Sequence, residues 1–210
     1  MLKKDSIFRL FTGIRLPLDL RRQLQSFQEG LTGVRRTAPE NYHITLSFIG
    51  NVDAAKAEDI DEALAGVRAP QFSLTVRGTG CFSGGRHLHH LWMGLEHSEP
   101  LHRLKEKIDR ALDVHKLPFE KRRYTPHVTL ASLKPGDEEK AAAFMQRHNL
   151  FASEPFDVRE FILYRSHPDK EGALYEELKA YPLFHADCWR CLCYWLSSLI
   201  LFISAMHWLT

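Results

Sequence analysis

The sequence predicts an α+β protein built from two similar lobes, and three observations lead to this fold class. The chain has 210 residues, enough for one domain or a compact two-lobed unit with a substantial core. Strand-like and helical segments alternate, and the order strand, helix, strand occurs twice. A pattern of histidine, apolar residue, threonine, apolar residue also occurs twice, at 43–46 and 127–130. These features favour two related halves over an all-parallel, doubly wound sheet.

The composition is that of an ordinary globular protein. Hydrophobic residues make up 44% and charged residues 26% of the chain, which excludes intrinsically disordered and fibrous classes. The formal net charge of +2 excludes a strongly polycationic nucleic-acid coat but is compatible with a local basic groove. Cys81 is the only cysteine before residue 188, and the first residues lack the pattern of a signal peptide. We therefore expect a reducing, cytoplasmic location.

The first half contains four strand patterns and two helix patterns. Pro17 ends the first strand, and apolar residues at helical spacing follow it. We expect strands at 7–14, 42–49, 72–76 and 88–95, and helices at 18–27 and 54–67. The last two strands should be separated by a loop that contains Gly78, Gly80, Gly84 and Gly85.

The second half follows the same order of elements. An amphipathic pattern of leucine and isoleucine predicts the first of its helices. We expect helices at 100–115 and 138–147 and strands at 126–130 and 156–164. The segment 173–183 should close the unit as a short helix or as a turn followed by a strand.

The repeated motif places an imidazole and a hydroxyl on one face of each of two strands, because side chains at i and i+2 of a strand point the same way. If the halves pack about a pseudo-two-fold axis, the two pairs meet across a cleft. In-line displacement at phosphorus needs a base on one side and an acid on the other, and two histidines supply both near neutral pH. Threonine hydroxyls can donate to the non-bridging phosphate oxygens. The motif pair therefore predicts metal-independent phosphodiester chemistry.

Four segments of the chain resemble the 2H phosphoesterase superfamily, and specifically its RNA 2′,3′-cyclic phosphodiesterase branch, also called 2′-5′ RNA ligase. The resemblance covers about residues 6 to 184, and the pair of motifs is its most specific part. The matching segments are the opening strand, the surroundings of the two motifs and the closing segment, at 8–17, 39–50, 123–131 and 175–183.

The resemblance implies a bilobal fold of mainly antiparallel sheet with outer helices and a central cleft. It implies hydrolysis of RNA 2′,3′-cyclic phosphate ends, on tRNA-like or oligonucleotide substrates, to 2′-phosphomonoesters without a metal or cofactor, with reversible 2′-5′ ligation as an accompanying reaction. By similarity, His43 is the proton donor to the leaving 3′ oxygen and His127 is the proton acceptor that activates water. The same similarity implies that Thr45 and Thr129 hold the phosphate. We expect a monomer.

Three further residues are candidates for substrate binding: Arg123, Tyr42 and Lys134. Relatives often carry an arginine shortly after the second motif, where this chain has Ser132, and Lys134 is a candidate substitute. Tyr42 and Tyr124 adjoin the motifs and could stack on a base or pack in the core. The basic residues near the motifs could follow an RNA backbone or lie on a solvated face; they are Arg35, Arg36, Lys121, Arg122 and Arg123.

Two other groups of residues invite a functional interpretation. His87, His89 and His90 could bind a metal, but the absence of a nearby carboxylate or cysteine run favours a polar loop. Cys81 has no neighbouring motif that would activate it as a nucleophile.

The composition changes near residue 187, so we divide the chain into a catalytic domain at 1–184 and an apolar tail at 185–210. The 19 residues 191–209 carry no formal charge, which is just long enough to span a bilayer. Three interpretations of the tail remain open. It is a membrane anchor, a buried terminal helix, or a segment foreign to the domain such as a shifted reading frame would produce. Its cysteines with His185 form an incomplete metal-binding pattern at Cys188, Cys191 and Cys193.

Two other functions remain open at this point. The domain could act on small cyclic nucleotides, or it could bind nucleotides or RNA without catalysis. The two intact histidine–threonine pairs argue against the binding module. Comparison of 2′,3′-cyclic AMP with a cyclic-phosphate-ended oligonucleotide would distinguish the two enzymatic alternatives.

Overall fold

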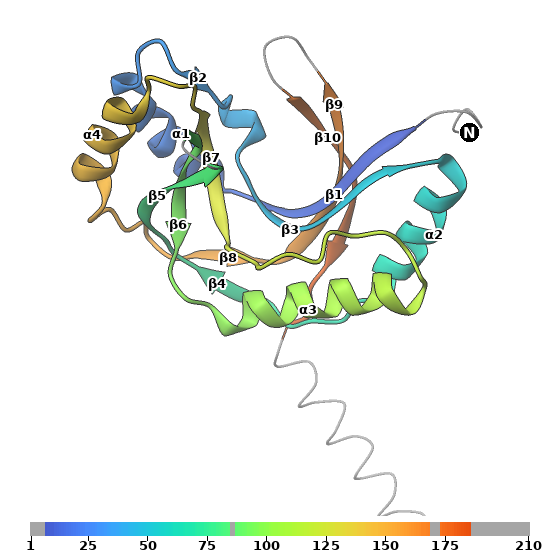
Figure 1. Cartoon of the computed structure of the whole chain (residues 1–210). Helices are drawn as coiled ribbons and strands as arrows, with labels where there is room; N and C mark the ends of the chain where they lie inside the picture. The colour runs from blue at the N-terminus through green and yellow to red at the C-terminus, as the bar shows by residue number, and fades with distance from the viewer. Residues whose placement is uncertain (1–6, 85–86, 169–172, 186–210) are drawn as a thin grey trace, which may run out of the picture.

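The computed structural model describes residues 7–84, 87–168 and 173–185. Within these ranges the chain forms a large curved sheet, a two-stranded sheet and four α-helices (Figure 1). The helices are α1 (Leu18–Phe27), α2 (Ala54–Ala65), α3 (Glu99–Val114) and α4 (Glu138–His148). The strands are β1 (Phe8–Arg15), β2 (Arg35–Arg36), β3 (His43–Val52), β4 (Phe72–Leu74), β5 (Val76–Gly84), β6 (His87–Leu95), β7 (His127–Ser132), β8 (Phe156–Val158), β9 (Glu160–Pro168) and β10 (Ala173–Pro182).

The large sheet is antiparallel and has the strand order β10-β9-β1-β3-β7-β6-β5, with β2 paired to β7. The order from β9 to β5 consists of two sets of three strands that meet between β3 and β7: β9, β1 and β3 on one side, and β7, β6 and β5 on the other. Each half contributes a strand, a helix and then a motif strand: β1, α1 and β3 in the first, β6, α3 and β7 in the second. The small sheet pairs β4 with β8, which occupy corresponding places in the two halves. The predicted pair of similar halves, with mainly antiparallel sheet, is therefore confirmed.

The two halves of the sheet meet at a single paired position, Ile44 of β3 opposite Val128 of β7. Both residues are fully buried and are the central apolar residues of the two motifs. The residues on either side of them point to the opposite face of the sheet because side chains alternate along a strand. The pairing thus brings both histidines and both threonines to one place on the concave face.

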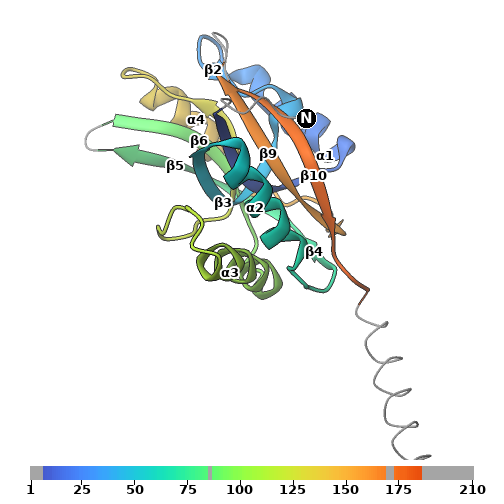
Figure 2. The ribbon, with the colours of Figure 1, turned by 90° about the vertical axis from the view of Figure 1, so that its right-hand side faces the viewer.

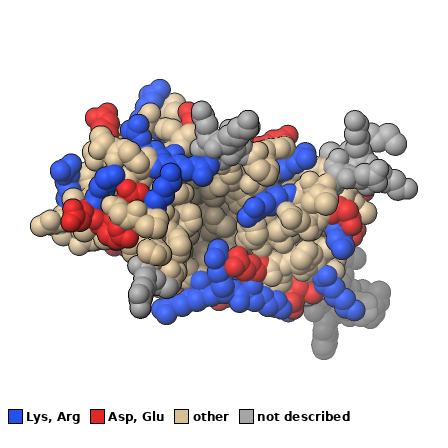
Figure 3. Space-filling model, turned by 45° about the horizontal axis from the view of Figure 1, so that its top comes forward, with Lys and Arg blue, Asp and Glu red and all other residues tan. Residues whose placement is uncertain are grey.

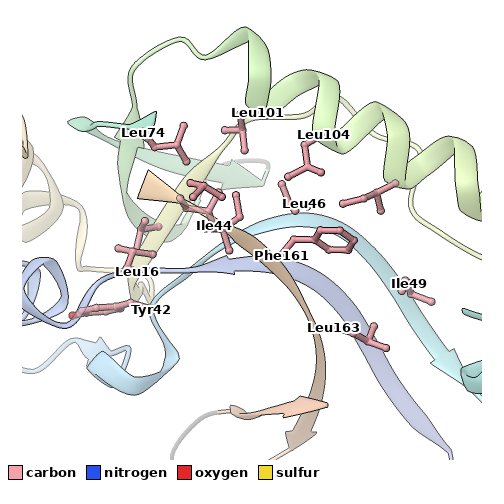
Figure 4. Close-up of a cluster of buried hydrophobic side chains, with 14 of the residues drawn as sticks. Leu16, Tyr42, Ile44, Leu46, Ile49, Leu74, Leu101, Leu104, Phe161 and Leu163 are labelled. Atoms are coloured by element: carbon pink, nitrogen blue, oxygen red, sulfur yellow. The ribbon is translucent and has the colours of Figure 1, made fainter. Parts of the chain in front are cut away.

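The core lies on the opposite face of the sheet, where α3 packs against it. Leu101 and Leu104 of α3 face Leu46 of β3 and Phe161 of β9, and all four are buried (Figure 4). Ser98 caps this helix by accepting a hydrogen bond from the backbone N–H of Leu101, at 3.4 Å. The helices α2 and α3 lie next to each other outside the sheet (Figure 2). Burial of these apolar side chains supports the first motif strand, β3, on the face opposite the cavity.

The glycine-containing segment that was expected to be a loop is instead part of a strand, β5, which runs through Gly78, Gly80 and Gly84. Gly80 pairs with Trp92 of β6, and a Cβ atom built at Gly80 would lie 2.3 Å from the indole ring. The missing side chain lets the indole lie flat on the neighbouring strand. Gly80 therefore marks close packing, and Gly85, the last glycine of the expected loop, lies outside the described residues.

The closing segment is a strand, β10, paired with β9 over its whole length except for a bulge near Leu178. Of the two alternatives considered for 173–183, the strand is therefore right. The tail beyond His185, with its three cysteines, lies outside the described residues. Among the residues that the structure does describe, no helix has both the length and the apolar character needed to cross a bilayer.

Candidate active site

The concave face of the sheet holds a cavity of about 1510 Å³ that both halves line. Figure 3 shows the hollow, with lysine and arginine side chains gathered around it. His43 and Thr45 of the first motif and His127 and Thr129 of the second all line the cavity. The structure therefore brings together the four residues that the repeated motif singles out.

His43 is held in one orientation by the backbone just before its strand. Its Nδ1 lies 2.7 Å from the carbonyl oxygen of Asn41, and because a carbonyl only accepts, Nδ1 carries the hydrogen and donates it. In the neutral ring Nε2 then has the free lone pair, and the Thr45 hydroxyl lies 3.1 Å from it. Burial lowers the pKa of His43 to about 4, helped by the nearby His127 and opposed by the Asn41 carbonyl. His43 is therefore neutral at pH 7 in the free protein.

His127 is oriented in the same way by the second half. Its Nδ1 lies 2.7 Å from the carbonyl oxygen of Thr125, two residues earlier, so its Nε2 is also available toward the cavity. Burial lowers the pKa of His127, and positive charge at His90 and Arg122 lowers it further, against the effect of the Thr125 carbonyl. Two imidazoles with equivalent hydrogen bonds thus lie at one cavity.

The aromatic surroundings of the two histidines also correspond. Tyr175 of β10 packs edge-on against His43, with ring centroids 4.9 Å apart. Phe82 of β5 packs edge-on against His127, at 4.7 Å. Both aromatic rings line the cavity. Each histidine is therefore restrained by an aromatic side chain that a substrate can also touch.

A hydrogen bond links the two motif segments. Tyr124, three residues before His127, donates through its hydroxyl to the backbone carbonyl of Thr45 at 3.2 Å. Lys105 of α3 lies over the Tyr124 ring, 5.3 Å from its centroid, and pairs with Asp109. Asp109 in turn accepts from Ser47 of β3. This network fixes the first motif strand relative to the segment that carries the second motif.

The charged side chains around the cavity are mostly basic. Two acidic residues, Glu29 and Glu120, line it. Seven basic residues do so: Arg9, Arg22, Arg35, Arg36, Lys105, Arg122 and Arg123. An excess of cations in a concave site attracts phosphate groups.

The three predicted substrate-binding residues lie in three different environments. Arg123 lines the cavity. Tyr42 lies in the hydrophobic core with 2% exposure, which matches the core-packing alternative and keeps its ring away from the cavity. Lys134 is exposed and lies outside the cavity lining.

Several cavity residues were not among the predicted site residues. Phe82 and Tyr175 come from parts of the chain far from the motifs, and only the sheet register brings them to the site. Asn41 lies two residues before His43 and also lines the cavity. His90 lines the cavity, whereas its neighbours in the predicted histidine cluster do not. His87 lies 4.0 Å from Glu138 instead. In the part of the chain that the structure describes, no three histidine, cysteine or acidic side chains come together as a metal site would need.

A family model and curated relatives that match this chain point to the same family. The family model described as the 2′-5′ RNA ligase superfamily matches residues 16–170. The RNA 2′,3′-cyclic phosphodiesterase of Archaeoglobus fulgidus is 27% identical over 177 residues, covering 82% of this chain and 99% of that protein. The protein of the same name from Thermotoga maritima is 31% identical over 178 residues, covering 81% of this chain and 92% of that protein.

Solved structures resemble this one in fold. Escherichia coli LigT complexed with 3′-AMP superposes with a TM-score of 0.70 at 24% identity, covering 86% of this chain and 100% of that chain. TT0787 of Thermus thermophilus superposes with a TM-score of 0.69 at 22% identity, covering 85% of this chain and 99% of that chain.

Proposed function

This chain belongs to the 2′-5′ RNA ligase superfamily, and from that premise and the geometry of the cleft we propose that it hydrolyses RNA 2′,3′-cyclic phosphate ends to 2′-phosphomonoesters. The curated relatives that match most of the chain carry the name of this activity. The single observation that carries the proposal is the meeting of His43 and His127 at one cavity, each with Nδ1 bound to a backbone carbonyl and Nε2 available for proton transfer.

The proposed reaction is an in-line displacement at phosphorus. His127 accepts a proton from water at Nε2 while the water oxygen attacks phosphorus, and His43 donates a proton to the 3′ oxygen as that bond breaks. Thr45 and Thr129 donate hydrogen bonds to the non-bridging oxygens, where negative charge must be stabilised. The surrounding arginines neutralise the phosphates of the RNA chain. A 5′-hydroxyl that attacks in place of water would give a 2′-5′ linkage by the same displacement of the 3′ oxygen.

The proton donor must be charged before it can act, although burial keeps His43 neutral in the free protein. A bound cyclic phosphate brings a negative charge close to the ring, and an opposite charge at this distance raises the pKa of a histidine. Substrate binding thus raises the pKa of His43, so that the ring carries the proton that it donates in the reaction. The Thr45 hydroxyl can change from donor to acceptor toward Nε2 because a hydroxyl does both.

The size of the cavity favours RNA over a free cyclic nucleotide. Pockets for small molecules usually have volumes of about 300–1,000 Å³. The cavity here, at about 1510 Å³, exceeds this range and has basic residues along both walls. A single nucleotide would leave most of those cations unused.

The test is an assay on an oligonucleotide with a 2′,3′-cyclic phosphate end, in EDTA, beside 2′,3′-cyclic AMP. We expect turnover of the oligonucleotide, a bell-shaped pH dependence, and at least a ~10²-fold loss of kcat in His43→Gln and in His127→Gln. His97→Gln, which changes an exposed histidine outside the cavity, is the matched control. Full activity in either active-site variant, or complete loss of activity on chelation, would refute the proposal.

A further inference from the structure

A strip of four side chains crosses the second half of the sheet on its concave face. Phe82 of β5 pairs with His90 of β6, His90 pairs with Ser132 of β7, and Ser132 pairs with Arg35 of β2. Directly paired residues of antiparallel strands project to the same face. All four also line the cavity. The bulge at Leu130 and Ala131 turns Ser132 toward this face, which strict alternation from Thr129 would not do.

The strip has the chemistry of a nucleotide-binding surface. Phe82 is half-buried and offers an aromatic ring on which a base can stack. His90 and Ser132 supply hydrogen-bonding groups at the level of a ribose, and Arg35 supplies a cation for a phosphate. The order along the strip therefore follows the order of groups in a nucleotide, from base to sugar to phosphate.

The strip begins beside His127 and not beside His43. Phe82 lies edge-on to the His127 ring at 4.7 Å, whereas the corresponding ring beside His43 is Tyr175. In the in-line reaction the attacking oxygen lies at the base, His127, and the leaving 3′ oxygen lies at the acid, His43. The ribose that bears the cyclic phosphate is attached to the leaving oxygen, so it lies toward His43. The strip consequently lies on the side of the attacking group.

We propose that Phe82, His90, Ser132 and Arg35 form an acceptor subsite, which binds a nucleotide whose 5′-hydroxyl attacks the cyclic phosphate in place of water. The inference rests on the proposed function. The 5′ oxygen forms a bond to phosphorus and the bond from phosphorus to O3′ breaks. His127 receives the proton of the 5′-hydroxyl and His43 supplies one to O3′, so the product is a 2′-5′ phosphodiester and no redox partner is required.

The decisive measurement is the ratio of ligated to hydrolysed product in one reaction that contains a cyclic-phosphate-ended oligonucleotide and an excess of a 5′-hydroxyl dinucleotide. Phe82→Ala should lower this ratio roughly 5- to 150-fold, because loss of one stacked base has an effect of that size. The ratio does not depend on the folded fraction or on damage to His127, because formation of either product requires folded protein and an intact His127. Phe82→Tyr should restore it.

Tyr175→Ala is the matched control, because Tyr175 holds the corresponding position beside His43. It should lower both products together and leave the ratio unchanged. Arg35→Gln should remove the advantage that a 3′-phosphate on a 5′-hydroxyl nucleoside gives in the wild-type reaction. The dissociation constant of the dinucleotide alone should rise in Phe82→Ala, and this measurement needs no turnover.

The acceptor subsite is wrong if Phe82→Ala leaves the ratio unchanged, if Tyr175→Ala lowers it as much, or if the wild-type protein forms no ligated product at saturating dinucleotide. A wild-type protein that hydrolyses no cyclic phosphate refutes the proposed function instead. In that case an unchanged dinucleotide affinity in Phe82→Ala refutes the subsite as well, and a weakened affinity supports it as a binding site.

Discussion

The buried imidazole of His43 makes the stability of this protein depend on pH, and one substitution can isolate its effect. The folded state keeps the ring neutral down to about pH 4, because burial lowers its pKa from 6.5 to about 4. The unfolded chain takes up the proton near pH 6.5. Between these values unfolding is coupled to proton uptake, so the free energy of unfolding falls as the pH falls through this window.

The size of the effect follows from the two pKa values. A difference between 6.5 and about 4 corresponds to about 3 kcal/mol once both states are protonated, and to about 2 kcal/mol between pH 7 and pH 5. Other histidines, such as His127, also have lowered pKa values and add to the total loss. His43→Gln removes only the contribution of His43 and keeps a side-chain amide that can donate to the Asn41 carbonyl.

Urea unfolding at pH 7 and pH 5 tests this prediction in both proteins. The wild-type protein should lose about 2 kcal/mol more than His43→Gln between the two pH values. Equal losses would show that the pKa of His43 is not lowered in the folded state. Titration of the His43 ring by NMR provides the second readout, and a 2′-phosphate-ended oligonucleotide should raise its pKa, in keeping with its role as the proton donor.

Three further predictions concern the site, the sheet and the tail. Thr45→Val and Thr129→Val should each cost roughly 2–4 kcal/mol of transition-state stabilisation with little change in melting temperature, and normal turnover in both would make these residues structural. Gly80→Ala should destabilise the protein by about 1–3 kcal/mol in urea unfolding, since the new methyl group would meet the Trp92 ring at 2.3 Å, and an unchanged midpoint would contradict this packing. A chain without residues 187–210 should keep the full rate per folded molecule, because the family resemblance ends before them; an unstable or inactive product would show that the tail packs on the domain.

Local sequence patterns predicted most of the helices and strands, and they singled out four residues that the structure brings together at the cavity. Helical periodicity located α1 and α3 to within one residue at each end, because an amphipathic face is visible in the sequence itself. The two motifs revealed His43 and His127 because each is a short pattern on one strand. Both kinds of signal are local, and neither depends on which strands become neighbours.

Features that depend on pairing between distant strands could not be predicted from the sequence. The glycines of β5 resembled a loop because only the position of Trp92 on β6 explains why Gly80 must lack a side chain. Phe82 and Tyr175 carry no local signal of function, since their place beside the histidines results from the order of strands in the sheet. Tyr42, next to the first motif in sequence, could stack on a base or pack in the core, and its burial in the core became clear only from the structure.

The single paired position between the two halves has a mechanical consequence. If one half rotates against the other about the contact of Ile44 with Val128, each atom is displaced in proportion to its distance from that axis. The histidines and threonines flank these two residues and would move least, whereas β5 and β10, at the two ends of the strand order, would move most. A rotation large enough to let a polynucleotide enter or leave would thus barely change the spacing of the reacting groups. Such a rotation would separate substrate exchange from the alignment of the reacting groups.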